Sequence, residues 1–254
     1  MNAPASFEDP GIDYGDRFRA GIIVPSGNVV AEAEIRAMLP RGVAPLFTRL
    51  ALRGSSEAEL VGMLSGLEVA SGLLADAKVD LIVFHCTAVS TFAPHAGETI
   101  RNRIERATGI PAFATSDAII GAVNTLDIKR LSLLTPYIEP VHAREVAFLA
   151  AHDIDVVDGA YLGIDTNAEM ASLTPSALYD WVARHHSTKS DGCFLSCTAI
   201  RSAGIISRLE QVLARPVITS NQAMVWHLLQ LAGISRSVEG FGSLLNTRRE
   251  RQAR

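Results

Sequence analysis

Short apolar segments alternate with longer amphipathic segments along the whole chain. The short segments are rich in β-branched residues and end at proline or polar residues, so they are predicted to be strands. They are Ala20–Val24, Leu46–Leu50, Leu81–Phe84, Ala112–Thr115, Leu131–Thr135, Val156–Tyr161, Gly192–Leu195 and Val217–Thr219. The segments between them carry apolar residues at helical spacing and are predicted to be helices. These are Ala31–Leu39, Glu57–Ala77, Thr99–Thr108, Ala143–His152, Pro175–His185, Ile205–Leu213 and Gln222–Ala232. This alternation predicts an α/β fold with parallel sheets covered by helices on both faces.

The pattern runs through the chain twice. Pro25 and Pro136 each end a first strand, and Cys86 and Cys197 each follow a third strand; both pairs are 111 residues apart (136 − 25 and 197 − 86). The segment FHCTAVS at 84–90 parallels LSCTAIR at 195–201, and IPAFATS at 110–116 parallels RPVITSN at 215–221. These landmarks keep the same order in both halves. The repeat predicts two homologous lobes related by a pseudo-two-fold axis.

The repeat also sets the expected domain limits. Residues 1–17 are predicted to be a flexible tail, residues 18–116 with 221–246 a first lobe, and residues 117–220 a second lobe. The last helix is expected to return to the first lobe, because it parallels the helix that leads from the first half into the second. Residues 247–254 are predicted to be a solvated basic tail, since they carry Arg248, Arg249, Arg251 and Arg254 around Glu250.

Composition narrows the class of protein. Of the 254 residues 48% are hydrophobic and 20% charged, which is typical of a soluble globular protein. No uninterrupted apolar run approaches about 18 residues, and the first residues lack the basic and apolar segments of a signal peptide. We therefore expect a cytoplasmic protein without a membrane segment. The net charge of −4 gives no reason to expect nucleic-acid binding.

The sequence predicts no metal and no cofactor. The three cysteines lack the spacing of zinc sites, and disulfides are not expected in a cytoplasmic protein. His185 and His186 are adjacent and would point in different directions from a helix. Lys78, Lys129 and Lys189 each lie in a polar turn before a strand, so a pyridoxal Schiff base is not expected. No glycine-rich nucleotide loop follows any strand.

Cys86 and Cys197 carry the predicted chemistry. Ligands bind parallel sheets beyond the carboxyl ends of the strands, where both residues lie, so two lobes packed face to face would place the cysteines across one cleft. The small residues that follow each cysteine are expected to begin a helix, whose free N–H groups would bind a carboxylate and lower the pKa of the thiol. A thiolate and a thiol so placed can exchange protons with a carbon between them, or attack it. Cys193 lies inside an apolar strand and is predicted to be a core residue.

From about Arg19 to Leu245 the sequence resembles the aspartate/glutamate racemase superfamily, and within it the maleate cis-trans isomerase branch, to which arylmalonate decarboxylases are related. The resemblance rests on the turn Pro25-Ser26-Gly27-Asn28 with Glu32 and Glu34 after it, on the segments at 134–137 and 165–167, and on the two Cys-Thr loops. It implies two pseudo-symmetric lobes with the active site between them. It also leads us to expect a homo-oligomer, a dimer or a tetramer.

The resemblance implies a role for each site residue. Cys86 would add to the double bond of maleate, and Cys197 would give and take the proton at the neighbouring carbon. Rotation about the new single bond and elimination of Cys86 would then give fumarate. The dicarboxylate would be held by side chains and by the residues after each cysteine: Asn28, Tyr137, Asn167, Thr87, Ala88, Thr198 and Ala199. Thr87 and Thr198 are also candidates to cap helices.

Each binding residue also has a purely structural interpretation. Asn28 is common in turns, Asn167 could cap a helix, and Tyr137 could pack at a strand end. His85 departs from the small residue expected before the first cysteine. Because side chains alternate along a strand, it is predicted to point away from Cys86 as a satisfied buried histidine, with a role as its base as the alternative. Glu32 and Glu34 are expected to support the first helix, because they would repel an anionic substrate.

Three other functions stay open at this stage. A two-cysteine racemase of an amino acid or a hydantoin would use one thiol to remove a proton and the other to return it. The turn at 25–28 offers no acidic partner for a substrate ammonium group, which favours a plain diacid. A malonate-type decarboxylase resembles the fold but keeps only the second cysteine, so Cys86 counts against it. A small-acid binding protein would need no reactive thiol.

Overall fold

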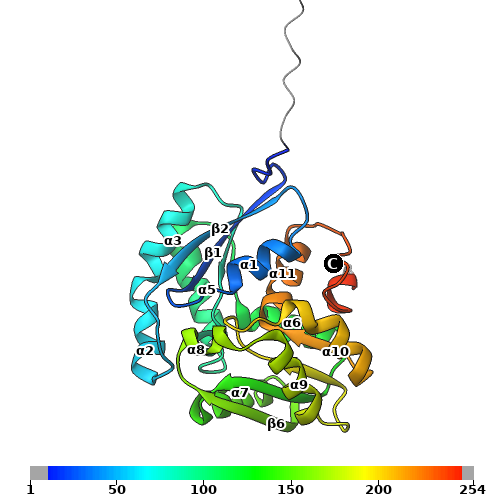
Figure 1. Cartoon of the computed structure of the whole chain (residues 1–254). Helices are drawn as coiled ribbons and strands as arrows, with labels where there is room; N and C mark the ends of the chain where they lie inside the picture. The colour runs from blue at the N-terminus through cyan, green and yellow to red at the C-terminus, as the bar shows by residue number, and fades with distance from the viewer. Residues whose placement is uncertain (1–10, 248–254) are drawn as a thin grey trace, which may run out of the picture.

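The computed structural model describes residues 11–247, which form two α/β halves. Within this range there are two sheets of four parallel strands, with the orders β2-β1-β3-β4 and β6-β5-β7-β8. The strands are β1 Phe18–Pro25, β2 Val43–Leu50, β3 Leu81–Phe84, β4 Ala112–Ala114, β5 Arg130–Tyr137, β6 Asp155–Ile164, β7 Gly192–Leu195 and β8 Val217–Thr219. The strands β5, β6, β7 and β8 take the same places in the second sheet as β1, β2, β3 and β4 take in the first. The predicted fold class is therefore confirmed. In Figure 1 the first sheet and its helices occupy the upper part of the molecule and the second the lower part.

Helices connect successive strands in both halves. They are α1 Ala31–Met38, α2 Glu57–Gly62, α3 Leu67–Asp76, α4 Thr87–Ser90, α5 Ala96–Thr108, α6 Thr115–Thr125, α7 Glu139–Ala150, α8 Asn167–Ser172, α9 Pro175–His185, α10 Ile206–Leu213 and α11 Ser220–Leu231. Short 3-10 turns are η1 Met63–Gly66, η2 Ala203–Ile205 and η3 Leu244–Asn246.

The buried strands explain why both faces of each sheet are covered. In β1 six consecutive residues from Ala20 to Pro25 are buried. Because side chains alternate along a strand, Ile22 and Val24 pack into one core while Ile23 packs into the other. The core that contains Ile23 extends across both halves to the side chain of Tyr137. The other core likewise extends from β1 to Leu131 and Leu133 of β5, so both cores hold the two sheets together.

Several predicted helix bounds are corrected. Helix α7 begins at Glu139, four residues before the predicted Ala143, because Pro140 fits the first turn of a helix, where its missing N–H costs nothing. Helix α5 likewise begins at Ala96 rather than Thr99. The sequence did not predict α8, whose cap is Thr166 in a reciprocal hydrogen-bonded box with Glu169.

The two halves are joined by a pair of equivalent helices. Each starts directly after the last strand of its sheet, α6 after β4 and α11 after β8, and the two pack against each other. Helix α11 also packs against α1 of the first half. The lobe limits at residues 117 and 220 remain a prediction. Of the two predicted tails, residues 1–10 and 248–254, with the terminal arginines, lie outside the described residues.

One helical stretch matches a membrane span by length and composition alone. It covers Glu57–Asp76, and a third of its most apolar window, 33%, is buried in the protein. The stretch is divided into α2 and α3 by the 3-10 turn η1. Its residues Leu60, Met63 and Leu67 are buried in the core. We therefore interpret it as a helical layer of the first half.

Candidate active site

Cys86 lies at the carboxyl end of β3, where the chain turns into helix α4. It has ordinary extended backbone angles (φ −149°, ψ 111°) and precedes the first residue of that helix, so the predicted helix start after this cysteine is confirmed. The N–H groups of Ala88 and Val89 point at its sulfur and favour the thiolate. The side chain is 4% exposed. Thr87 does not cap the helix; its hydroxyl hydrogen bonds elsewhere.

Cys197 occupies the equivalent position after β7, but its local structure differs. Its φ of +133° lies in a region that non-glycine residues rarely adopt. No helix begins behind it; turns lead to η2, and the next α-helix starts at Ile206, so the predicted helix after this cysteine, and with it a cap at Thr198, is wrong. The N–H of Ala199 nevertheless reaches the Cys197 sulfur at 3.2 Å. The strained backbone turns the chain so that one N–H faces the thiol.

A chain of two hydrogen bonds joins the cysteine loops. The Thr87 hydroxyl donates to Ser220 Oγ at 2.8 Å, and the Cys197 N–H donates to the same oxygen at 3.1 Å. Ser220 is the first residue of α11, the helix that crosses between the halves. The thiols are also close enough that a negative charge on Cys197 raises the pKa of Cys86. The predicted meeting of the two motifs at one place is therefore confirmed.

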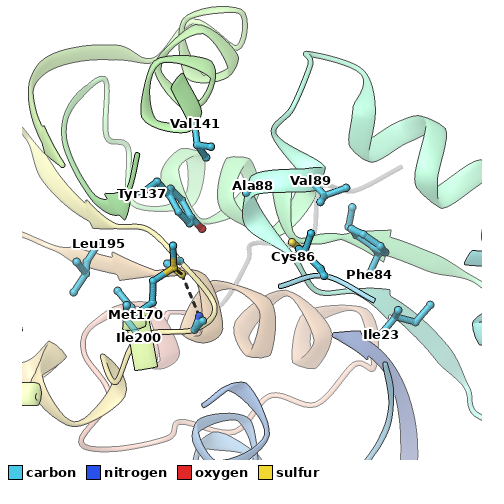
Figure 2. Close-up of a cluster of buried hydrophobic side chains, with 14 of the residues drawn as sticks. Ile23, Phe84, Cys86, Ala88, Val89, Tyr137, Val141, Met170, Leu195 and Ile200 are labelled. Carbon is cyan, nitrogen blue, oxygen red and sulfur yellow. Dashed lines mark hydrogen bonds between the residues drawn. The ribbon is translucent and has the colours of Figure 1, made fainter. Parts of the chain in front are cut away.

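Tyr137 completes the space between the cysteines. It is the last residue of β5, is 4% exposed, and its hydroxyl donates a hydrogen bond to the Cys197 sulfur, which favours the thiolate of that residue. Figure 2 shows the Tyr137 hydroxyl and the Cys86 sulfur turned toward the same space, with Met170 below it. Met170, from α8, lies 3.7 Å from the Cys197 sulfur. Burial is the largest cause that raises the pKa of Tyr137, so its hydroxyl stays protonated and can donate.

Burial dominates the protonation of the thiols. It raises the pKa of Cys86 and of Cys197 to about 12 each, although backbone N–H groups act in the opposite direction. The N–H groups lower the pKa of each thiol as predicted, but the loss of hydration on burial outweighs them, so the net shift is upward. Cys193 is fully buried in β7, with its pKa also raised to about 12 by burial, and is the predicted core residue.

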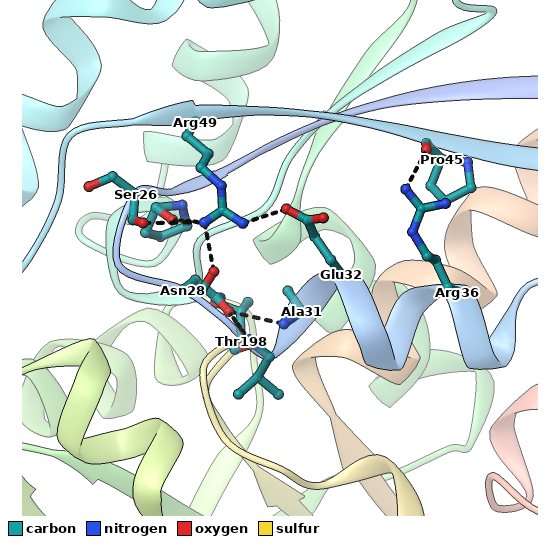
Figure 3. Close-up of polar contacts among 10 residues, drawn as sticks. Ser26, Asn28, Ala31, Glu32, Arg36, Pro45, Arg49 and Thr198 are labelled. Carbon is teal, nitrogen blue, oxygen red and sulfur yellow. Dashed lines mark hydrogen bonds and ion pairs between the residues drawn. The ribbon is translucent and has the colours of Figure 1, made fainter.

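Asn28 holds the first half to the loop of Cys197. Its Nδ2 donates to the carbonyl oxygen and to the hydroxyl of Thr198, both at 3.0 Å, while its Oδ1 accepts from the N–H groups of Val30 and Ala31 at the start of α1. Figure 3 shows this amide beneath the Arg49 guanidinium, which binds the Asn28 carbonyl at 2.7 Å and pairs with Glu32. Both donor and both acceptor positions of the Asn28 side-chain amide are used by protein atoms. Asn28 therefore stabilises the turn before α1 and at the same time contacts the loop of Cys197.

Asn167 lies at the edge of the site and is half-buried. Its Nδ2 donates to the Leu52 carbonyl at 3.4 Å, and its N–H to the Arg53 carbonyl at 3.3 Å, which links α8 to the first half. A Cβ at position 27 would lie 3.2 Å from the Asn167 Cβ, so Gly27 lets the opening turn approach this residue closely. Glycine at position 27 thus has a local steric reason.

His85 is the satisfied buried histidine that strand alternation predicted. Its Nε2 donates to Asn221 Oδ1 at 2.8 Å and its Nδ1 faces the Thr115 hydroxyl at 3.1 Å. The Asn221 amide in turn donates to Glu34 at 2.7 Å. Burial lowers the pKa of His85 to about 4, so it is a weak base, and both of its ring nitrogens are already engaged by other residues. Glu34 also accepts from the Ala203 N–H at 2.8 Å, so it links the first helix to η2 and α11, a wider structural role than the predicted support of that helix alone.

The sequence did not point to several residues of this site. Ser220, Asn221, Met170 and Glu145 all lie in or beside it, yet none belongs to a repeated cysteine motif. The parallel between the segments at 110–116 and 215–221 was the one signal that could have led to Ser220 and Asn221. No cluster of three metal-binding side chains occurs among residues 11–247.

Comparisons with known proteins agree with this geometry. A family model described as arylmalonate decarboxylase matches residues 20–245. The maleate isomerase of Geobacillus stearothermophilus is 28% identical over 244 residues, which cover 90% of this chain and 97% of that protein. The arylmalonate decarboxylase of Bordetella bronchiseptica is 32% identical over 146 residues, 56% of this chain and 61% of that protein. A crystal structure of a cysteine-to-alanine variant of the maleate isomerase from Pseudomonas putida S16 with maleate superposes with a TM-score of 0.84 at 26% identity, and covers 90% of this chain and 97% of that one.

Proposed function

This chain belongs to the arylmalonate decarboxylase family, and we propose that it is a cofactor-independent isomerase that converts maleate, or a closely similar cis-dicarboxylate, to fumarate. The observation that carries the proposal is the pair Cys86 and Cys197, whose loops are joined through Ser220. Similarity to a maleate isomerase over nine-tenths of the chain supports the same activity. The sequence match to the Bordetella bronchiseptica decarboxylase covers 56% of the chain, and a decarboxylase crystal structure superposes over 91% of it with a TM-score of 0.76, against 0.84 for the maleate isomerase with maleate.

The proposed reaction divides the work between the two sulfurs. The Cys86 thiolate adds to one alkene carbon, and the electron pair of the double bond takes the proton of Cys197 at the other carbon. The former double bond is now a single bond and rotates. The Cys197 thiolate then removes a proton from that carbon, the double bond re-forms, and Cys86 leaves as thiolate. No electron is gained or lost overall, so the steps need no redox partner.

Ionisation of Cys86 is the main cost that the site has to offset. A thiol with a pKa of about 12 carries one thiolate in about ten thousand at pH 8, a cost of about 5 kcal/mol. This cost already includes the lowering by the N–H groups of Ala88 and Val89, and a substrate carboxylate would bind at the same donors. The N–H groups that follow Cys197 would serve the second carboxylate.

Side chains from both halves would position the substrate. We propose that the Tyr137 hydroxyl and the amides of Asn28 and Asn167 bind the carboxylates, together with the N–H groups at Thr87, Ala88, Thr198 and Ala199. The Asn28 amide holds Thr198 in the free protein, so a carboxylate would take over one of these bonds. The amino-acid racemase, decarboxylase and binding-protein alternatives have less support, because the curated sequence relatives that match nine-tenths of the chain are maleate isomerases.

Location and assembly complete the proposal. We propose a cytoplasmic enzyme that acts on a free small dicarboxylate and forms a homo-oligomer, a dimer or a tetramer. These statements rest on the composition of the chain and on its family. Size-exclusion chromatography with light scattering would measure the oligomeric state.

Proton NMR of the purified protein with maleate tests the activity. We expect fumarate to appear at a rate proportional to enzyme, equally after dialysis against a chelator, and not with the Cys86→Ala variant. Activity that is lost on dialysis and returns only with added metal would contradict the cofactor-independent mechanism. Loss of carbon dioxide from an arylmalonate, without conversion of maleate, would assign the chain to decarboxylation instead.

A further inference from the structure

Two carboxyl groups, the fully buried Glu145 and the half-buried Glu34, follow the same internal repeat as the cysteines. Glu34 on α1 and Glu145 on α7 are 111 residues apart (145 − 34), the offset that also separates Cys86 from Cys197. Burial raises the pKa of both carboxyls. A negative charge on either one raises the pKa of Cys197, whereas neither acts on Cys86 in the same way. Both carboxyl groups therefore lie near Cys197.

Glu145 has an unusual environment for a carboxyl group. It lies on the buried face of α7 with Val141 and Phe148, and no part of it is exposed. Its Oε1 accepts a 2.6 Å hydrogen bond from Ser196, the residue before Cys197. Its Oε2 has no hydrogen-bond partner within residues 11–247. A carboxylate in this place would leave one charged oxygen without compensation.

No cation neutralises this carboxyl in the described part of the chain. Arg144, its neighbour on α7, pairs with Glu57 at 2.7 Å and stacks on Phe92. His142, one turn earlier, lies at 3.1 Å from the Thr135 hydroxyl. The other polar groups near Glu145 are the Tyr137 hydroxyl at the end of β5 and the Cys197 thiol after β7, and both become harder to ionise when Glu145 is charged.

The backbone of Cys197 needs such an anchor. A non-glycine residue at φ +133° persists only where its surroundings hold it in place. Its N–H is held by Ser220, and the preceding Ser196 is held by its N–H to the Leu134 carbonyl and by its hydroxyl to Glu145. The corresponding residue before Cys86 is His85, which is held by Asn221. Each cysteine is thus preceded by a buried polar side chain with a buried partner.

We propose that Glu145 is a positioning residue of the reaction: as a neutral acid it holds Ser196, and with it the strained Cys197, and its ionisation disables the Tyr137–Cys197 pair. This inference rests on the proposed isomerase function. The carboxyl acts through its neighbours and does not touch the substrate. Burial raises the pKa of Glu145 to about 8, so the neutral form predominates at neutral pH and the charged form appears in mildly alkaline solution.

The direction of the pH effect follows from charge. Above the pKa of Glu145, a carboxylate next to Tyr137 and Cys197 opposes the transient Cys197 thiolate and repels a dianionic substrate. The profile of kcat/KM against pH should therefore bend downward near pH 8 in the wild type. Glu145→Gln keeps an acceptor for Ser196 but cannot ionise, so this bend should disappear. At neutral pH its kcat should stay within about threefold of the wild type, because one neutral hydrogen bond replaces another.

Two controls separate positioning from general damage. Glu139→Gln removes an exposed charge from the first turn of the same helix, and its profile should keep the wild-type bend. Ser196→Ala should lower kcat about tenfold, because the anchor is lost while the acid remains. Glu145→Met, which removes the acceptor, should lower kcat by a similar factor. Adding it to Ser196→Ala should then cost little more, since both changes remove the same interaction. A bend that persists in Glu145→Gln, or effects of Glu145→Met and Ser196→Ala that simply multiply, would overturn the proposal.

Two measurements decide the matter without substrate. Infrared spectra at neutral pH should contain a buried protonated carboxylic acid band that Glu145→Gln lacks; its presence unchanged in the variant would refute the neutral acid. Urea unfolding of the same four proteins of the double-mutant cycle should show the same coupling between Glu145 and Ser196, and additive losses of stability would refute the anchor. Failure of maleate conversion by the wild type would instead refute the proposed function and leave these two results standing.

Discussion

Tyr137→Phe removes a single hydroxyl from the closed space between the two cysteines. Tyr137 is 4% exposed, and its hydroxyl donates to the Cys197 sulfur in the free protein. The ring remains packed in the core that joins the two halves, so the substitution leaves the shape of the pocket unchanged. The change therefore tests one hydrogen bond to a sulfur that has to carry charge during turnover.

The size of the effect follows from the charge on the acceptor. A hydrogen bond to a charged group contributes about 1.5–3 kcal/mol, whereas one to a neutral thiol contributes less. Loss of this bond where Cys197 is a thiolate should lower kcat about 10- to 150-fold. If Tyr137 mainly bound a substrate carboxylate, as the family resemblance implies, KM would rise as well. The contact with Cys197 leads us to expect the larger part of the loss in kcat.

Steady-state kinetics of maleate conversion, followed by fumarate formation, measures both constants. Tyr179→Phe provides a matched control, because Tyr179 is half-buried on α9 in the same half and packs under Arg208 away from the sulfurs. Its constants should equal those of the wild type. A Tyr137→Phe enzyme with kcat within about twofold of the wild type would show that the hydroxyl does not stabilise the Cys197 thiolate, because even a weak charged hydrogen bond exceeds that factor.

Two further predictions concern the sulfurs and the opening turn. Cys86→Ala should abolish turnover and also any covalent adduct of maleate in intact-protein mass spectrometry. Cys197→Ala should abolish turnover, because the carbon next to the new C–S bond lacks its proton. An adduct that persists only in Cys86→Ala would reverse the roles of the two cysteines. Asn28→Ala should lower the free energy of unfolding by about 2 kcal/mol in urea titrations, because it removes the cap of α1 and the bonds to Thr198 together, and an unchanged stability would contradict that structural role.

The strands were predictable because burial on both faces leaves a simple signature. All eight predicted strands occur within the described residues, several of them extended by a few residues at one or both ends. A parallel strand covered on both sides is apolar at every position, so β3 and β7 are readable as short uninterrupted runs. Helix α8 was missed because its six residues are too few to show a period. Its cap, Thr166, was the one available signal.

The position of the cysteines was predictable, but their protonation was not. Strand ends in parallel sheets meet at one edge, so the repeat was enough to bring Cys86 and Cys197 together. The pKa of each thiol depends on burial, which is decided by residues far away in the chain, such as Met170 from α8 and Tyr137 from β5. The strained φ of Cys197 also depends on Ser220, which lies 23 residues away. Such contacts leave no local pattern in a sequence.

The repeat makes the two halves similar, yet the proposed reaction needs two sulfurs with different roles. The difference arises at positions where the repeat is broken. Tyr137 lies 111 residues after Ser26, so a phenol faces Cys197 while the matching serine binds the Leu52 carbonyl at 3.4 Å. A helix begins behind Cys86 and lends it two N–H groups, whereas Cys197 has one such N–H and the phenol.

These differences suit the two tasks. A nucleophile has to ionise before it attacks the alkene, and the N–H groups at the start of α4 are fixed donors that favour the thiolate of Cys86 against the effect of burial. A proton donor has to start neutral and be charged only briefly. Burial keeps the proton on Cys197, and the Tyr137 hydroxyl stabilises the thiolate for the moment in which the proton is on carbon. The asymmetry that assigns the roles is therefore built from the few residues that do not repeat.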